Sequence, residues 1–185
     1  MTKLPDGYEI KEITFSECEK LSMPYKKIIF DDKEQILRFD EANISGCSNQ
    51  LNPLTISLGV FCQGKFIGWS TGLQTNTHEF YMMNSAILEE HRRLGLYTML
   101  LKSMLKQAQE SGFSRVFSRH NACNNSIIIP KLKLGFLITG TEISDVFGIL
   151  VHLSFYTNNI RSKTALYRTG YTKPDDEIKK HLKLD

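Results

Sequence analysis

The run from residue 87 to residue 97 joins an apolar stretch to an amphipathic helix through two arginines and a glycine. The first turn of a helix leaves backbone N–H groups without partners and carries partial positive charge, so anions bind there readily. Gly95 has no side chain to keep a phosphate away, and Arg92 and Arg93 add formal charge. The run therefore predicts a strand, a turn and a helix that can hold a pyrophosphate. Taken alone, the same residues also fit an ordinary solvated turn.

The segment before this run is typical of mixed secondary structure. Alternating apolar residues predict a strand over 8–13, and Thr14 with Glu17 has the spacing of a helix capping box. A second helix is expected over 32–44, where apolar residues can form a stripe, and a polar loop over 45–53. The chain therefore enters its central part after one strand and two helices.

Three strand-like runs then follow in quick succession, over 54–62, 65–73 and 79–88. Gln63 and Gly64 between the first two favour a tight hairpin, so an antiparallel meander is predicted. From Leu94 the apolar period becomes helical, until Ser111 and Gly112 end the helix. The pyrophosphate turn thus lies between the last strand of a meander and a long helix.

The second half continues as a strand, a helix and two strands, expected over 114–119, 124–134, 136–141 and 146–156. Beyond Asn158 nothing resembles a strand: residues 167–171 look like a loop, and residues 175–182 fit a short helix with its acidic residues first. The order of elements predicts a mixed α/β (α+β) fold. We expect one domain over 1–158 and a C-terminal extension over 159–185 that packs on the domain or on a partner.

Composition argues against several classes of protein. The net charge is only +3, from 23 basic and 20 acidic residues, whereas nucleic-acid binders concentrate many more basic residues on one face. The longest nearly apolar run, over 146–156, is too short to cross a bilayer, and residues 1–12 lack the apolar core of a signal peptide. The cysteines are widely spaced, with no CxxC motif and no histidine cluster, so we expect reduced thiols in the cytoplasm and no metal.

These motifs resemble the GCN5-related N-acetyltransferase (GNAT) superfamily. Its signature is a strand followed by Gln/Arg-x-x-Gly-x-Gly/Ala at the start of a helix, which residues 92–97 match except at Tyr97. Many members also place an asparagine about ten residues before a Gly-Phe pair, as Asn124 stands before Gly135 and Phe136 here. The resemblance extends over about residues 7–157. It implies a mixed, mostly antiparallel sheet of about seven strands with about four helices.

The resemblance implies acetyl-CoA as co-substrate, and transfer of its acetyl group directly to an amine of a small molecule or peptide by a monomer or homodimer. The backbone of Ser85, Ala86 and Ile87 would pair with the pantetheine arm. Asn124 would bond that arm from the other side, although asparagine is also a good helix N-cap. The implied pyrophosphate site consists of Arg92, Arg93, Leu94, Gly95, Leu96, Tyr97 and Thr98.

Catalysis needs a base for the attacking amine and is helped by an acid for the departing thiolate. Where many members have a tyrosine for the second task, this chain has Lys131. A lysine is protonated at neutral pH unless it is buried. Lys131 is therefore either a proton donor and electrostatic stabiliser of the thiolate, or a surface lysine whose stem packs on its helix.

The candidates for the base are Tyr81, then Glu79, then His120. Glu79 and Tyr81 are expected to share a strand face with Met83, Ser85 and Ile87, because side chains alternate along a strand. Alignment through the arginine turn puts Tyr81 where family members commonly have a glutamate. His120 has an intrinsic pKa suited to accepting a proton near neutral pH, and it equally fits a structural role at a strand end.

Two other functions stay open. Lys131 in place of tyrosine fits a catalytically weak CoA-binding module that regulates or binds a partner. The arginine turn also fits a binder of nucleotides, RNA or other phosphate-rich ligands. The surroundings of Ser85 and Arg119 distinguish these readings, since a narrow slot suits pantetheine and an open basic face suits a polyanion.

Overall fold

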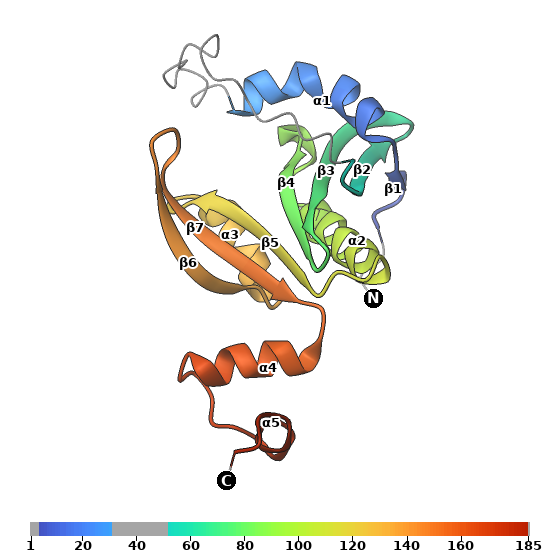
Figure 1. Ribbon diagram of the computed structural model, residues 1–185. Coiled ribbons are helices and arrows are strands. Elements are labelled where there is room, and N and C mark those ends of the chain that lie inside the picture. Colours follow the sequence, from blue (N-terminus) through green and yellow to red (C-terminus); the bar gives the residue numbers. More distant parts are fainter. Residues whose placement is uncertain (1–3, 31–51, 185) are drawn as a thin grey trace.

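Seven strands form one sheet in the order β1-β2-β3-β4-β5-β7-β6 in the computed structural model, which describes residues 4–30 and 52–184 (Figure 1). All neighbouring strands are antiparallel except β4 and β5, which are parallel. The strands are β1 (Tyr8–Glu12), β2 (Thr55–Cys62), β3 (Lys65–Asn76), β4 (Glu79–Ile87), β5 (Arg115–Asn121), β6 (Leu137–Ser144) and β7 (Gly148–Tyr156). The predicted mixed, mostly antiparallel sheet is confirmed.

The helices of the described residues are α1 (Phe15–Phe30), α2 (Leu96–Glu110), α3 (Asn125–Lys133), α4 (Asn159–Arg168) and α5 (Asp176–Leu182), with a 3₁₀ turn over Glu89–His91. The capping box is formed in part, because Thr14 Oγ1 accepts a hydrogen bond from Glu17 N at 3.1 Å. Gln63 and Gly64 both have positive φ, which is the geometry of a tight hairpin. The helix expected over 32–44 lies outside the described residues.

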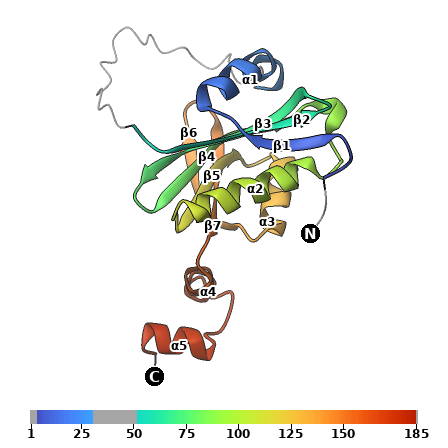
Figure 2. The ribbon, with the colours of Figure 1, turned by 90° about the vertical axis from the view of Figure 1, so that its right-hand side faces the viewer.

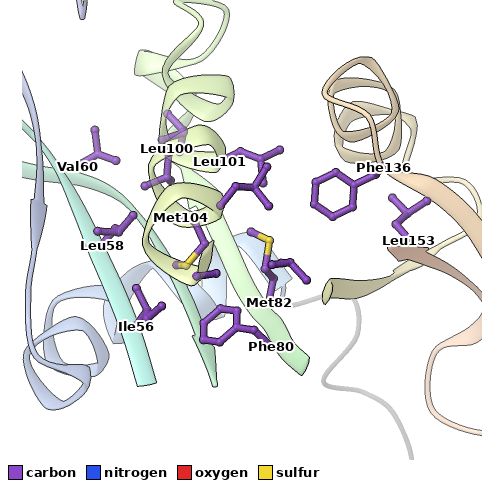
Figure 3. Packing of buried hydrophobic residues seen from close by; sticks show 14 of the residues in the cluster. Ile56, Leu58, Val60, Phe80, Met82, Leu100, Leu101, Met104, Phe136 and Leu153 are labelled. Atoms are coloured by element: carbon purple, nitrogen blue, oxygen red, sulfur yellow. The ribbon is translucent and has the colours of Figure 1, made fainter. Parts of the chain in front are cut away.

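Helices cover both faces of the sheet (Figure 2). On one face α1 contributes Cys18 to a small buried cluster with Phe66, Trp69 and Ala86. On the other face α2 and α3 pack against the main core. In Figure 3 the α2 side chains of this core lie beside Phe80 and Met82 of β4, with residues of β2 on one side and Phe136 and Leu153 on the other. The apolar stripe predicted for α2 is fully used: Leu96, Leu100, Leu101, Met104, Leu105 and Ala108 are all buried.

The sheet divides between its two parallel strands. β4 and β5 pair only over Glu79–Tyr81 and Arg115–Phe117; beyond these residues β4 stays paired with β3, and β5 with β7, but not with each other. Figure 1 shows the two ribbons close at one end and apart at the other. Because the strands are parallel, α2 and α3, which follow them, both begin near the edge where the strands have separated.

A β-bulge in β4 overturns one expectation about strand faces. Asn84 pairs with Thr71 and Met82 pairs with Gly72, so Met83 between them has no partner on β3. One extra residue inverts the alternation of side chains beyond it. Glu79 and Tyr81 therefore lie on the α1 face with Ala86, and the prediction that they share a face with Ser85 and Ile87 is wrong. Ser85 and Ile87 lie on the α2 face with Met82.

The chain after β7 forms two helices, of which the sequence indicated one. The prediction of α5 is confirmed, with Asp175 Oδ1 accepting from Ile178 N at 2.9 Å. The loop expected over 167–171 is partly wrong, because α4 includes Tyr167 and Arg168. Asn158 caps α4 through bonds to two backbone N–H groups, and Lys163 on α4 bonds to Asp175 and Glu177 around the start of α5. No helix in the described ranges has the length and apolarity to cross a membrane.

Candidate active site

The arginine-glycine turn connects β4 to α2. Arg93 has φ 64° and Gly95 has φ 77°, and the chain between Ile87 and Arg93 makes one 3₁₀ turn. The first bond into α2 runs from Met99 N to Gly95 O, at 3.2 Å. The N–H groups of the preceding helical residues consequently have no acceptor within the helix. A Cβ at Gly95 would meet no atom within 4 Å, so the space beside the turn is open.

The two arginines have different roles. Arg92 Nε donates to the carbonyl oxygen of Ile87 at 3.0 Å, which holds the turn against the end of β4. Arg93 is exposed and makes no such bond to the strand among the hydrogen bonds of the described residues. His91, within the same turn, shares a hydrogen bond of 2.9 Å between its Nδ1 and the hydroxyl of Tyr8, which links the turn to β1. The turn is therefore fixed on both sides by the fold.

Tyr97, the departure from the family signature, does not fill this turn. Its side chain packs against the main core, and burial raises the pKa of its phenol. Leu96 beside it is buried in the same core, while Leu94 is exposed and Thr98 is half-buried. The side chains of α2 that follow Gly95 therefore anchor the helix, and the backbone is left to meet a ligand.

The residues expected along the pantetheine arm lie where β4 and β5 have separated. Ser85 Oγ is 2.8 Å from Ser70 Oγ on β3, and Ala86 and Ile87 are buried. Asn124 stands at the N-cap position of α3, but its side chain does not cap the helix backbone. Its Oδ1 instead accepts from Ser126 Oγ at 2.8 Å. The position predicted for Asn124 is confirmed, and side-chain capping of the backbone is wrong.

Lys131 is buried at the point where the two strands part. The side chain is 1% exposed, and Nζ donates to Ser118 Oγ at 2.7 Å and lies 3.7 Å from Met82 Sδ. Met82 and Ser118 are the first residues beyond the last pair of β4 with β5. Nζ also lies 5.0 Å from the ring centroid of Phe136. The reading of Lys131 as a surface lysine is therefore wrong, because α3 packs this face against the sheet.

Burial has changed the proton affinity of this amine. Desolvation lowers the pKa of Lys131 to about 7, because the ammonium form loses its hydration in the core. The contacts that Nζ makes are a hydroxyl, a thioether and an aromatic ring, and none of them carries negative charge. Near neutral pH the amine can thus hold a proton or release it.

The opposite face of the sheet carries paired charges. Glu79 Oε1 accepts from Arg115 Nη1 at 2.7 Å, and this bond holds the pKa of Glu79 below its usual value. Glu142 accepts from Arg119 at 3.2 Å and bonds His152 Nε2 at 2.8 Å. The pKa of Glu142 is lowered most by its hydrogen bond to His152 and next by its hydrogen bond to Arg119.

Tyr81 lies between these two charged groups. Its ring centroid is 5.1 Å from that of Phe117, and the guanidinium of Arg119 lies 5.4 Å from its ring. Tyr81 is half-buried and is the last residue of β4 that pairs with β5. It is therefore at the same level of the sheet as Lys131, on the other side.

The four candidate catalytic residues thus fall into two pairs. Glu79 and Tyr81 are on the α1 face, whereas His120 and Lys131 are joined on the other face through Ser118, whose Oγ is 2.9 Å from His120 Nε2. Sequence reasoning missed Ser118. The signal for it was present, because Ser118 stands two residues before His120 on one strand and so shares its face.

Comparison with known proteins agrees with this geometry. Residues 15–136 match the model of the Acetyltransferase (GNAT) family. A curated relative, the beta-lysine N(6)-acetyltransferase of Methanococcus maripaludis, is 24% identical over 151 residues, which cover 78% of this chain and 51% of the relative. The chain therefore spans about half the length of that relative.

Two solved structures that contain acetyl-CoA share the fold. The protein yncA of Salmonella typhimurium, with its cofactor acetyl-CoA, has a TM-score of 0.62 at 14% identity and covers 83% of this chain and 96% of its own. A GNAT family acetyltransferase of Elizabethkingia anophelis with acetyl-CoA bound has a TM-score of 0.58 at 13% identity, covering 82% and 99%. The family match runs from the first residue of α1 to Phe136 and contains the arginine-glycine turn, and the chain belongs to the GNAT acetyltransferase family.

Proposed function

We propose that this chain is an N-acetyltransferase that moves the acetyl group of acetyl-CoA directly to an amine of its acceptor. The observation that carries the proposal is the turn at the start of α2, whose first N–H groups have no acceptor in the helix and where the space beside Gly95 is open, at the edge where β4 and β5 have separated. A helix start of this kind suits a pyrophosphate. Family membership and the two acetyl-CoA complexes of similar fold support the same ligand.

In this proposal the turn from Arg92 to Thr98 holds the pyrophosphate, chiefly through backbone N–H groups, and Arg93 adds charge. Ser85, Ala86 and Asn124 lie along the pantetheine arm. The carbonyl of Ile87 already accepts from Arg92, so its further bond to a ligand would use the second lone pair.

Acetyl-CoA supplies an activated thioester, and the side chains of this chain would move the protons. We assign Lys131 to deliver a proton from Nζ to the departing sulfur, because its amine lies at the strand division and has a pKa of about 7. We assign Tyr81 to take the proton released by the attacking amine. Glu79 is a weaker candidate for that task, since its carboxylate is committed to Arg115 and Asn76.

The other readings draw less support from the geometry. A binder of RNA or nucleotides needs an open basic face. The two arginines of β5, Arg115 and Arg119, are instead paired with Glu79 and Glu142, so their charge is neutralised. A regulatory CoA-binding module is favoured by the loss of the usual tyrosine. Lys131 is nevertheless buried in the place where a proton donor is useful, which favours catalysis.

For the acceptor we propose a small-molecule amine, and the name of the curated relative puts beta-lysine and other diamino acids first among compounds to test. We place the reaction in the cytoplasm, which the wide spacing of the cysteines supports. We further propose that residues up to 158 form the acyl-CoA domain, and that α4 and α5 form an extension from it.

Ligand binding is tested by thermal unfolding with and without acetyl-CoA. A ligand that binds only the folded chain raises Tm by mass action. Gly95→Glu should abolish the rise, because it puts a carboxylate and a strained φ at the turn. Gly112→Glu is the matched control: its φ is +86°, its Cβ position is equally open, and it lies at the other end of α2. That variant should bind acetyl-CoA like the parent chain.

The activity is tested by thiol release with a panel of diamino acids, polyamines and peptides. Release of CoA in the presence of one amine, and of its acetylated product, supports the proposal. Absence of a Tm rise with acetyl-CoA beside a clear rise with RNA would overturn it, as would a Gly95→Glu variant with unchanged affinity.

A further inference from the structure

We infer that Ser118 and His120 form a proton relay that restores the proton on Lys131 after each turnover. The inference rests on the proposed function, because it gives a source for the proton that Lys131 delivers. Ser118 and His120 act here through Lys131 and are positioning residues. The relay joins a buried amine to a half-buried imidazole through one hydroxyl.

The three groups form an unbroken chain of short hydrogen bonds. Lys131 Nζ is 2.7 Å from Ser118 Oγ, and the same oxygen is 2.9 Å from His120 Nε2. A hydroxyl has one proton and two lone pairs, so Oγ can accept from one neighbour while it donates to the other. With Lys131 charged, Oγ accepts from Nζ and donates to His120. With Lys131 neutral and His120 charged, both bonds reverse.

Lys131 needs this hydrogen-bonded chain because its amine has no direct contact with solvent. Its side chain is 1% exposed and that of Ser118 is 0% exposed. The other contacts of Nζ are Met82 and Phe136, which have no proton to exchange. A proton given to the departing sulfur therefore cannot be replaced directly from solvent, and the half-buried imidazole is the group through which it can come.

The charged groups of the neighbouring strands do not compete with this path. On β4, Glu79 and Tyr81 lie on the opposite face of the sheet, and on β5 Arg115 and Arg119 lie on that face as well, bonded to Glu79 and Glu142. On α2, the phenol of Tyr97 is buried in the core with a raised pKa. On α3 itself, Lys133 is exposed.

The proton steps balance. Nζ gives one proton to the thiolate and becomes a neutral amine. Ser118 then passes its hydroxyl proton to Nζ while His120 passes the Nε2 proton to Oγ, so the hydroxyl is unchanged at the end. His120 must take up a proton from solvent or buffer before this transfer, and after it the imidazolium is neutral imidazole again. No bond to carbon forms or breaks in the relay.

The first test measures kcat and KM for thiol release with acetyl-CoA and an accepted amine. Ser118→Ala and His120→Ala should each lower kcat by about 10- to 100-fold, at or below the lower end of what acid–base assistance contributes, because they act through Lys131, with KM for acetyl-CoA little changed. Imidazole added to the His120→Ala assay should restore turnover in proportion to its concentration. The control is His78→Ala, which replaces an exposed histidine outside the site. This variant should keep the wild-type kcat, and added imidazole should not change its turnover.

A merely structural role for these residues predicts different results. Loss of packing would lower kcat without rescue by imidazole, and that result overturns the relay. Wild-type kcat in either Ser118→Ala or His120→Ala overturns it as well.

A second test needs no acceptor and separates the relay from the proposed activity. The ¹³Cε signal of Lys131 in the lysine-labelled chain reports the protonation of the amine as pH changes. Ser118→Ala should lower the titration midpoint of Lys131, because the hydroxyl is the acceptor that stabilises the ammonium, and His78→Ala should not. If no amine is acetylated but this coupling is found, the activity fails and the hydrogen-bonded chain stands. If acetylation occurs while Lys131 titrates identically in all variants, the relay fails.

Discussion

The two faces of the sheet differ sharply where β4 and β5 separate. On the face covered by α2 and α3, Lys131 has no acidic partner, and burial alone lowers its pKa to about 7. On the other face, Glu79 and Glu142 are partly exposed, and bonds to basic side chains lower their pKa values. Burial makes a group titrate near neutral pH, whereas pairing removes a carboxylate from that range. The buried face thus holds an amine that can exchange its proton near neutral pH, whereas the open face holds fixed charges beside Tyr81.

The largest expected effect comes from Lys131→Met, which keeps the stem and removes the amine. We expect kcat to fall roughly 100-fold, because the proton donor is lost. The same change should stabilise the fold at about pH 6. At this pH the folded wild-type chain buries the ammonium of Lys131, whereas the unfolded chain keeps it in water, and the methionine variant avoids this cost. Urea unfolding and thiol release of the same two proteins check both expectations.

The sign of the stability change depends on pH. Below about pH 7 the lysine is protonated in both states, and the full cost of its burial, on the order of 3–5 kcal/mol, is present. Between the folded value and the ordinary value of 10.5 the unfolded chain binds more protons, so wild-type stability rises with pH and the advantage of Lys131→Met shrinks. Lys133→Met, on an exposed part of α3, is the control. Lower stability of Lys131→Met at about pH 6 would contradict the buried-amine account.

A smaller effect is expected from the candidate bases on the open face. Tyr81→Phe should lower kcat about 10-fold, since it removes the hydroxyl assigned to the amine's proton. Glu79→Gln should change kcat less than about twofold, because its carboxylate already accepts from Arg115 and Asn76. Steady-state thiol release compares the two variants directly. The opposite order of effects would move the base to Glu79.

The smallest effect is expected for Glu142→Gln, which removes the charge that Glu142 shares with the partly exposed side chains of Arg119 and His152. The pKa of Glu142 is lowered in the folded chain, so its contribution to stability is present above its ordinary pKa and is lost as pH falls through the folded value. We expect a slight fall in Tm near neutral pH that vanishes in acid and weakens in high salt. A fall that persists in acid would mean that the glutamate matters through packing.

The sequence was sufficient where the determinants are local. The arginine-glycine turn needs only a strand end, a positive φ and a helix start, all within a dozen residues, and the structure places each where it was expected. The meander and the stripe of α2 follow in the same way from periods of two and 3.6 residues.

Other features depend on contacts between distant segments. The burial of Lys131 needs Met82 and Ser118, which are 49 and 13 residues away in the chain. The faces of β4 were misjudged because a single unpaired residue, Met83, inverts a regular alternation, and no residue type marks a bulge in advance. Helix α4 is not predicted because none of its residues is fully buried, although its Asn158 cap is a local signal.

The bond from Arg92 to Ile87 and the positive φ angles of Arg93 and Gly95 have a kinetic consequence. A loop that must be ordered by its ligand loses part of the interaction energy to that ordering and closes slowly. Here bonds within the chain hold the turn in shape. We therefore expect association to be fast and sensitive to salt, and the lifetime of the complex, more than its rate of formation, to reflect changes along the pantetheine arm.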